Sequence, residues 1–156
     1  MTETPSYIVS VDPGGVHVGV AVFERVEGSW VCRRATEMTP REFEDWLAET
    51  LHIVEHTLIV EEWRLFADRA KEQTGSAMET SQLIGVIKYI HRKAAPPNND
   101  IVWQQPTIKH PTRSVLNSRN VEITDKIDRG YSDHAIDAIL HGYYYIIKIL
   151  NEPITN

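Results

Sequence analysis

The chain has 156 residues, of which 42% are hydrophobic, and its formal net charge is -6. A chain of roughly 150 residues buries about two-thirds of its unfolded surface, so we expect a single domain, residues 1–156, with one core. Cys32 is the one cysteine, which excludes an intrachain disulfide and a cysteine-based zinc cluster and suits a reducing, cytoplasmic compartment. The sequence has no long uncharged apolar run and no leader-like N-terminus, so we expect no membrane role.

The negative charge is unevenly distributed along the chain. Residues 1–78 carry 7 Lys/Arg and 14 Asp/Glu, whereas residues 79–156 carry 9 and 8. Residues 88–119 are locally basic, with Asp100 as their one acidic residue against Lys88, Arg92, Lys93, Lys109, Arg113 and Arg119. Such a segment is compatible with binding to phosphate, although an ordinary solvated surface has the same composition.

The first three predicted strands follow one another closely. A β-branched run ends at Pro13-Gly14-Gly15 and a valine-rich run resumes at Val16, which is typical of a hairpin. Two later apolar runs are separated from these strands, and from each other, by helical patterns. Four strands are expected at residues 7–12, 16–23, 30–36 and 57–63, and a fifth begins at residues 101–103 and ends at Pro106.

Three helices are predicted between and after these strands. The first begins at Pro40, directly after the first residue of a capping box. The second has apolar residues at helical spacing over residues 83–90, and the third is capped by Ser132. Residues 107–130 are polar and are expected to be irregular. This order of elements predicts an α/β fold with a five-stranded mixed sheet, its first three strands antiparallel, and helices on both faces.

Acidic side chains lie at the ends of two predicted strands. Asp12 ends the first strand where the chain turns, although Asp before Pro-Gly is also a common turn residue. Glu61 and Glu62 end the fourth strand, and because side chains alternate across a sheet, only one of them can face a given site. The sequence leaves open which of the two does so.

The last helix adds Asp133, His134 and Asp137, and Asp137 can share a helix face with either of the other two. Asp133 lies in the first turn, where the helix dipole alone favours an acidic residue. Asp137 adjoins the apolar stripe, where a charge is costly unless it is paired or bound to a metal. Carboxylates from two strand ends and one helix would suit a pair of Mg²⁺ ions, which can promote hydrolysis of a phosphodiester.

In order and spacing over nearly the whole chain, these motifs resemble those of the RuvC-like Holliday junction resolvases of the RNase H-like superfamily, particularly the small bacteriophage versions. Residues 8–15 followed by 18–21 look like the first family motif, a strand that ends in a catalytic Asp and returns as a hairpin. Residues 58–63 match the second motif, an apolar strand that ends in Glu. Residues 133–138 look like the third motif, with Asp-Ala preceded by Asp or His three positions earlier.

The resemblance implies an RNase H-like fold and a metal-dependent endonuclease that resolves four-way DNA junctions by paired nicks. Asp12, Glu61 and Asp137 would ligate two Mg²⁺ or Mn²⁺ ions, and His134 would contact a metal or the attacking water. A helix start displaced by one residue would place Asp133 there instead, and this alternative stays open.

The resemblance also implies binding partners. Two symmetric nicks need two sites at a fixed separation, so the family acts as a homodimer, and the helix face over residues 83–90 resembles its dimer-forming region. Residues 105–109 resemble a segment in which a lysine approaches the DNA backbone. Trp63 and Phe66 would either stack on unpaired bases or pack internally. The residues expected to contact branched DNA are Lys88, Arg92, Lys109, Arg113 and Arg119.

Three other functions are compatible with parts of this pattern. Another RNase H-like nuclease, acting on RNA–DNA hybrids or duplexes, would have the same fold and metals. An actin-like ATP-binding domain has a similar opening hairpin, but that architecture needs two such domains and 156 residues provide one. A non-catalytic DNA- or protein-binding descendant is disfavoured because all the acidic and His positions are filled.

Overall fold

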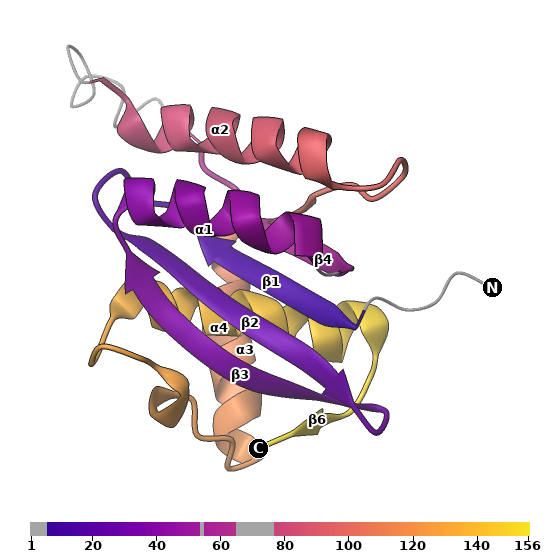
Figure 1. Ribbon diagram of the computed structural model, residues 1–156. Coiled ribbons are helices and arrows are strands. Elements are labelled where there is room, and N and C mark those ends of the chain that lie inside the picture. The colour runs from indigo at the N-terminus through magenta and orange to yellow at the C-terminus, as the bar shows by residue number, and fades with distance from the viewer. Residues whose placement is uncertain (1–5, 54, 65–76) are drawn as a thin grey trace.

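The computed structural model describes residues 6–53, 55–64 and 77–156, so Phe66 lies outside the described residues. One sheet of six strands has the order β5-β4-β1-β2-β3-β6 (Figure 1). The strands are β1 (Tyr7–Asp12), β2 (Val18–Val26), β3 (Ser29–Met38), β4 (His56–Glu61), β5 (Val102–Gln104) and β6 (Ile154–Thr155).

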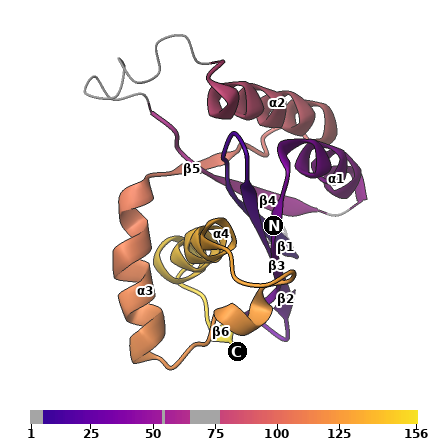
Figure 2. The same ribbon diagram turned by 90° about the vertical axis from the view of Figure 1, so that its left-hand side faces the viewer.

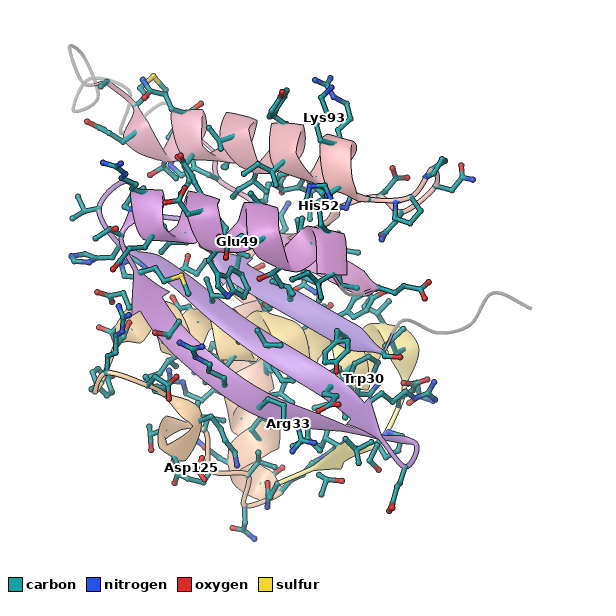
Figure 3. All side chains as sticks on the ribbon, in the orientation of Figure 1. Trp30, Arg33, Glu49, His52, Lys93 and Asp125 are labelled. Carbon is teal, nitrogen blue, oxygen red and sulfur yellow. The ribbon has the colours of Figure 1, made fainter. Side chains whose placement is uncertain are left out.

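The sheet is mixed, as predicted from the sequence. Strands β1, β2 and β3 are antiparallel neighbours, whereas β4 is parallel to β1 and β5 is parallel to β4. The number of strands differs from the prediction, because the two-residue β6 pairs in parallel with β3 at the opposite edge from β5. Two residues are too few to show an alternating pattern. Trp30 fixes this C-terminal segment, because its backbone N–H donates to Pro153 and its indole N–H donates to Glu152 (Figure 3).

Helices cover both faces of the sheet, as the element order predicted. Helices α1 (Pro40–Ile53) and α2 (Glu79–Ala94) lie on one face, and α3 (Lys109–Ser118) and α4 (Asp133–Tyr144) lie on the other (Figures 1 and 2). The predicted helix starts are confirmed, since Thr39 and Glu42 exchange capping-box hydrogen bonds and the Ser132 hydroxyl accepts one from Ala135. No helix among the described residues is long and apolar enough to cross a membrane.

The expectation that residues 107–130 are irregular is wrong. A 3₁₀ turn at Pro106–Ile108 leads directly into α3, and a second 3₁₀ turn lies at Thr124–Lys126. Pro111 is in the first turn of α3, where the missing N–H is tolerated. Only Thr112 and Leu116 of this helix are buried, so its apolar stripe is too narrow to give a clear helical period in the sequence.

Alternation along β1 and β4 determines which side chains face α4. Ile8 and Ile59 belong to the core beneath α4, whereas Val9 and Val60 belong to the core beneath α1 and α2. Residues two apart on a strand share a face, so Asp12 and Glu61 lie on the α4 side of the sheet. The Ser10 hydroxyl donates to the backbone oxygen of Ala138 at 2.7 Å, which fixes α4 along β1.

Two glycines allow α4 to lie directly against β2. A Cβ built on Gly19 would be 1.9 Å from the backbone oxygen of His134, and one built on Gly142 would be 2.1 Å from the ring of Phe23. Both distances are far below any tolerable contact. Gly19 therefore allows the start of α4 to lie next to the end of β1, and Gly142 allows the later part of the helix to approach β2.

Candidate functional site

The candidate site lies where β1 and β4 end side by side beneath α4. These two strands are parallel, and Val11 pairs with Val60, so Asp12 and Glu61 end neighbouring strands at the same edge. Asp137, on α4, lies close to them, because one lysine side chain contacts both Asp137 and Glu61. The three carboxylates that the sequence motifs singled out are therefore brought together by the fold.

The bridging side chain is Lys109, the first residue of α3. Its Nζ lies 2.7 Å from Asp137 Oδ2 and 3.0 Å from Glu61 Oε2. Burial lowers the pKa of Lys109, but the two carboxylates outweigh burial, so its pKa is raised and the ammonium is charged. The family resemblance implied that Lys109 approaches the DNA backbone, whereas in the structure it lies within the carboxylate cluster.

Asp12 is 6% exposed and contacts His134, whose Nδ1 lies 2.8 Å from Asp12 Oδ2. Burial and the negative charge of Glu61 raise the pKa of Asp12 to about 6, against the hydrogen bond from His134. Asp133 points elsewhere, because it is exposed and accepts a hydrogen bond from the Tyr131 hydroxyl at 2.8 Å. Of the two alternatives on α4, His134 is the residue that lies against Asp12.

The two glutamates at the end of β4 have different surroundings. Glu61 is directed toward α4 and contacts Lys109 and a second residue, His141. Glu62 instead accepts hydrogen bonds from Arg64 at 2.8 Å and from Gln105 at 3.0 Å. Among these residues, Glu61 is the one that shares the site with Asp12 and Asp137.

His141 and Gln104 belong to the site but were not singled out from the sequence. His141 is completely buried, with Nε2 at 2.7 Å from Glu61 Oε2 and Nδ1 at 2.8 Å from Gln104 Oε1. One signal was available, because His141 interrupts an apolar run four residues after Asp137, on the same helix face. Nothing in the sequence separates Gln104 from the neighbouring Gln105.

Of the four expected DNA contacts other than Lys109, Arg113 lies near this site, and Lys88 lies at the same end of β4 but on the opposite face of the sheet. Lys88 lies over the ring of Trp103 at 5.2 Å, and Trp103 pairs with Val60 at the end of β4. These two residues line a pocket together with Trp63. Arg113 follows Lys109 by one helical turn on α3. Asp133 raises the pKa of the Tyr131 hydroxyl, and Arg113 is close enough for its positive charge to oppose this effect.

The other two basic residues lie further away. Arg92 is in the last turn of α2, next to His91, whose ring contacts that of His56 at the start of β4. The length of β4, about 17 Å at 3.3 Å per residue, separates that point from Glu61. Figure 3 shows the neighbouring Lys93 at the same distant end of α2. Arg119 follows the end of α3, about 15 Å along the helix from Lys109.

The donor chemistry of the site fits a hard divalent cation. Each carboxylate uses one oxygen in the contacts given above, and Asp12 Oδ1, Glu61 Oε1 and Asp137 Oδ1 have no hydrogen-bond or ion-pair partner among the described residues. In the positions seen here, no three His, Cys, Asp or Glu side chains of the described residues are close enough to hold one ion. The Lys109 ammonium lies between two of the carboxylates and supplies positive charge there.

The chain matches no family model and no curated protein sequence. Its fold is similar to that of Thermus thermophilus RuvC in complex with a Holliday junction substrate, with a TM-score of 0.62 and 13% identity over 91% of this chain and 96% of that one. The fowlpox virus Holliday junction resolvase is similar with a TM-score of 0.58 and 16% identity, over 92% of this chain and 99% of that one.

The yeast mitochondrial Holliday junction resolvase is similar with a TM-score of 0.50 and 15% identity, over 87% of this chain and 77% of that one. The TM-scores show a shared fold, and identities this low show nothing beyond the fold. The sequence motifs at the two strand ends and on the last helix had predicted the same architecture. The chain therefore has the RNase H-like fold that these Holliday junction resolvases share.

Proposed function

We propose that this protein is a divalent-metal-dependent endonuclease that resolves Holliday junctions by paired nicks. The observation that carries the proposal is the convergence of Asp12, Glu61 and Asp137 at one end of a sheet with this fold, each with one carboxylate oxygen free of partners among the described residues. The similar structures include one in complex with a Holliday junction substrate.

In this proposal the three carboxylates hold Mg²⁺ or Mn²⁺, with His134 beside Asp12. When bound, two such ions would supply an activated water and stabilisation of the leaving oxygen of the phosphodiester. The charge balance of the site supports cation binding, because burial and the Glu61 carboxylate both work against ionisation of Asp12. A cation at the free oxygens would relieve this repulsion.

His134 is arranged to accept a proton. Above about pH 6 Asp12 is ionised and accepts a hydrogen bond from His134 Nδ1–H. The neutral imidazole then has its lone pair on Nε2. The side chain is 39% exposed, so an attacking water can reach this nitrogen. The role of His134 is therefore to take a proton at Nε2 while Asp12 fixes the orientation of its ring.

Lys109 and Arg113 are proposed to hold the phosphodiester. The Lys109 ammonium contacts both Glu61 and Asp137, so it would lose these contacts if the two carboxylates held a divalent cation. Lys109 is on a helix end with Arg113 one turn further on, so the displaced ammonium and the guanidinium can contact consecutive phosphates. Lys88 and the exposed ring of Trp103 lie on the opposite face of the sheet from Glu61, in a pocket that Glu62 also lines, so they would contact DNA outside the carboxylate cluster.

Resolution by two symmetric nicks requires a homodimer, which we propose as the working assembly. The helix face over residues 83–90 is not free for that role as expected, because Leu83 and Ile87 are buried in the core beneath α1 and α2. A dimer would have to use other surfaces. Sedimentation velocity with and without a four-way junction measures the assembly directly.

The decisive experiment compares three substrates under identical conditions. A synthetic four-way junction, an RNA–DNA hybrid and a linear duplex are incubated with the protein in Mg²⁺ and, as a control, in EDTA. The proposal expects Mg²⁺-dependent, symmetric nicks in the junction and little cleavage of the other two. Preferential cleavage of the hybrid would assign the protein to the hybrid-specific nucleases of the same fold.

A further inference from the structure

We propose that His141, supported by Gln104, is a positioning residue that fixes one oxygen of Glu61 and leaves the other directed to the metal. The inference rests on the proposed function and concerns residues that no sequence motif singled out. It predicts that metal affinity depends on a histidine that itself touches neither metal nor DNA.

The contact chain runs from the edge of the sheet to the centre of the site. Gln104 pairs with Glu61 across β5 and β4, so the two side chains lie side by side on the α4 face. His141 reaches both from α4, at 2.8 Å from Gln104 Oε1 and 2.7 Å from Glu61 Oε2. His141 is 0% exposed and Gln104 is 6% exposed, so water does not compete for these hydrogen bonds.

The hydrogen on His141 Nε2 can be assigned from its partner. Glu61 Oε2 lies 3.0 Å from the Lys109 ammonium, which can only donate, so this oxygen is the acceptor in its contacts. Nε2 therefore carries the hydrogen and donates it. The assignment does not depend on the orientation of the Gln104 amide. If its oxygen faces Nδ1 it accepts a hydrogen bond from Nδ1, and if its nitrogen faces Nδ1 it donates one.

Both contacts of Glu61 fall on the same oxygen. His141 Nε2 and Lys109 Nζ both approach Oε2, and Oε1 has no partner among the described residues. If Lys109 leaves when a cation enters, His141 still holds Oε2, so the carboxylate cannot rotate freely. Partners that orient a metal-binding side chain in this way are typically worth about 10- to 100-fold in metal affinity or activity.

Two isosteric replacements separate the two hydrogen bonds of His141. In His141→Gln the amide nitrogen takes the place of Nε2 and can still donate to Glu61, whereas in His141→Asn it takes the place of Nδ1 and can contact only Gln104. We expect His141→Asn to weaken Mn²⁺ binding, measured by isothermal titration calorimetry, by about tenfold or more. We expect His141→Gln to stay within a few-fold of wild type.

The cleavage assay should show the same order, with kcat lowered in His141→Asn and KM for the junction unchanged. His91→Asn is the matched control, since His91 is also a buried histidine but lies at the opposite end of β4. It is expected to lower the melting temperature without changing Mn²⁺ affinity. If His141→Asn does not fold, Gln104→Met removes the support of His141 and is expected to weaken Mn²⁺ binding in the same direction.

The outcomes distinguish the two proposals. Equal Mn²⁺ affinity for wild type, His141→Asn and His141→Gln would overturn the positioning role, even if all three cut junctions. A wild-type protein that binds Mn²⁺ but cuts no nucleic acid would overturn the proposed function, and the order of Mn²⁺ affinities would still decide the role of His141. A wild-type protein that binds no Mn²⁺ would overturn both.

Discussion

The backbone oxygen of His134 lies so close to Gly19 that no side chain fits between them, with 1.9 Å left for a Cβ. Gly19 pairs with Asp12 across β1 and β2. The same glycine thus lies opposite one site residue on the sheet and beneath another on α4. The spacing between Asp12 and His134 depends on this contact.

Gly19→Ala is therefore expected to displace the start of α4 and to damage both stability and the site. Overpacking of this kind costs about 1–3 kcal/mol of unfolding free energy, which denaturant titration measures. Gly85→Ala is the control, because Gly85 is in α2 with no atom within 4 Å of its added Cβ, and it should stabilise by about 0.5–1 kcal/mol. Wild-type stability and cleavage in Gly19→Ala would show that the close approach does not position α4.

Asp12→Asn and Asp137→Asn are each expected to abolish Mg²⁺-dependent cleavage while junction binding stays nearly intact. Both substitutions remove a metal-binding oxygen charge, whereas binding depends on the basic residues and on shape. Gel-shift titration in Ca²⁺ or EDTA measures binding, and nicking in Mg²⁺ measures catalysis. Retained cleavage by either variant would refute the assignment of these ligands.

The raised pKa of Asp12 predicts a pH-dependent stability of the metal-free protein. Folding moves this pKa from 3.8 to about 6, so the stabilising contribution is complete below about pH 3.8 and is lost as the pH rises through about 6. In EDTA at pH 7.5, Asp12→Asn should therefore be more stable than wild type, by ~1–3 kcal/mol. The difference should shrink as the pH falls toward 4.5, and a difference that is constant with pH would contradict the shift.

Lys109→Met removes the positive charge between Glu61 and Asp137, so the stability of the variant is expected to depend on added Mg²⁺. Without the ammonium, Glu61 and Asp137 lose a shared partner, so the variant should melt at a lower temperature in EDTA. Mg²⁺ should bind about tenfold more tightly, corresponding to roughly 1.4 kcal/mol of relieved competition. Lys126→Met removes the same charge from a pair with the exposed Asp125, outside the carboxylate cluster, and should change neither quantity.

The two glutamates at the end of β4 give a matched test of the sheet geometry. Glu61→Gln should eliminate metal-dependent cleavage, because Glu61 faces Asp12 and Asp137. Glu62→Gln should retain cleavage, since Glu62 contacts Arg64 and Gln105 instead. The reverse result would mean that β4 presents its opposite face to α4.

Most of the architecture could be predicted from local patterns. The hairpin at Pro13-Gly14-Gly15 and the capping residues at Thr39 and Ser132 are short-range signals, and each is confirmed. Helix α3 could not be predicted, because it buries only two residues and begins close to two prolines. The short β6 is stabilised by contacts with Trp30 from the other end of the chain, which no local pattern encodes.

The sequence predicted only those site residues that lie at strand ends or at helical spacing from one another. Glu61 could not be chosen over Glu62, because Leu58, Ile59 and Val60 are all apolar and hide the alternation of faces. The place of Lys109 depends on the packing of α3 against α4, a long-range relationship. His141 and Gln104 become neighbours only when β5 pairs with β4 beneath α4.

Strand β5 lies at the edge of the sheet and consists of three paired residues. Slipping its register by one residue would exchange the faces of Trp103 and Gln104. An indole would then replace the amide next to His141, and the start of α3 would shift with it, carrying Lys109 away from the two carboxylates. The charge of the candidate site is thus set by the alignment of a three-residue strand, and insertions between Gln104 and Lys109 should be far less tolerated than insertions after α3.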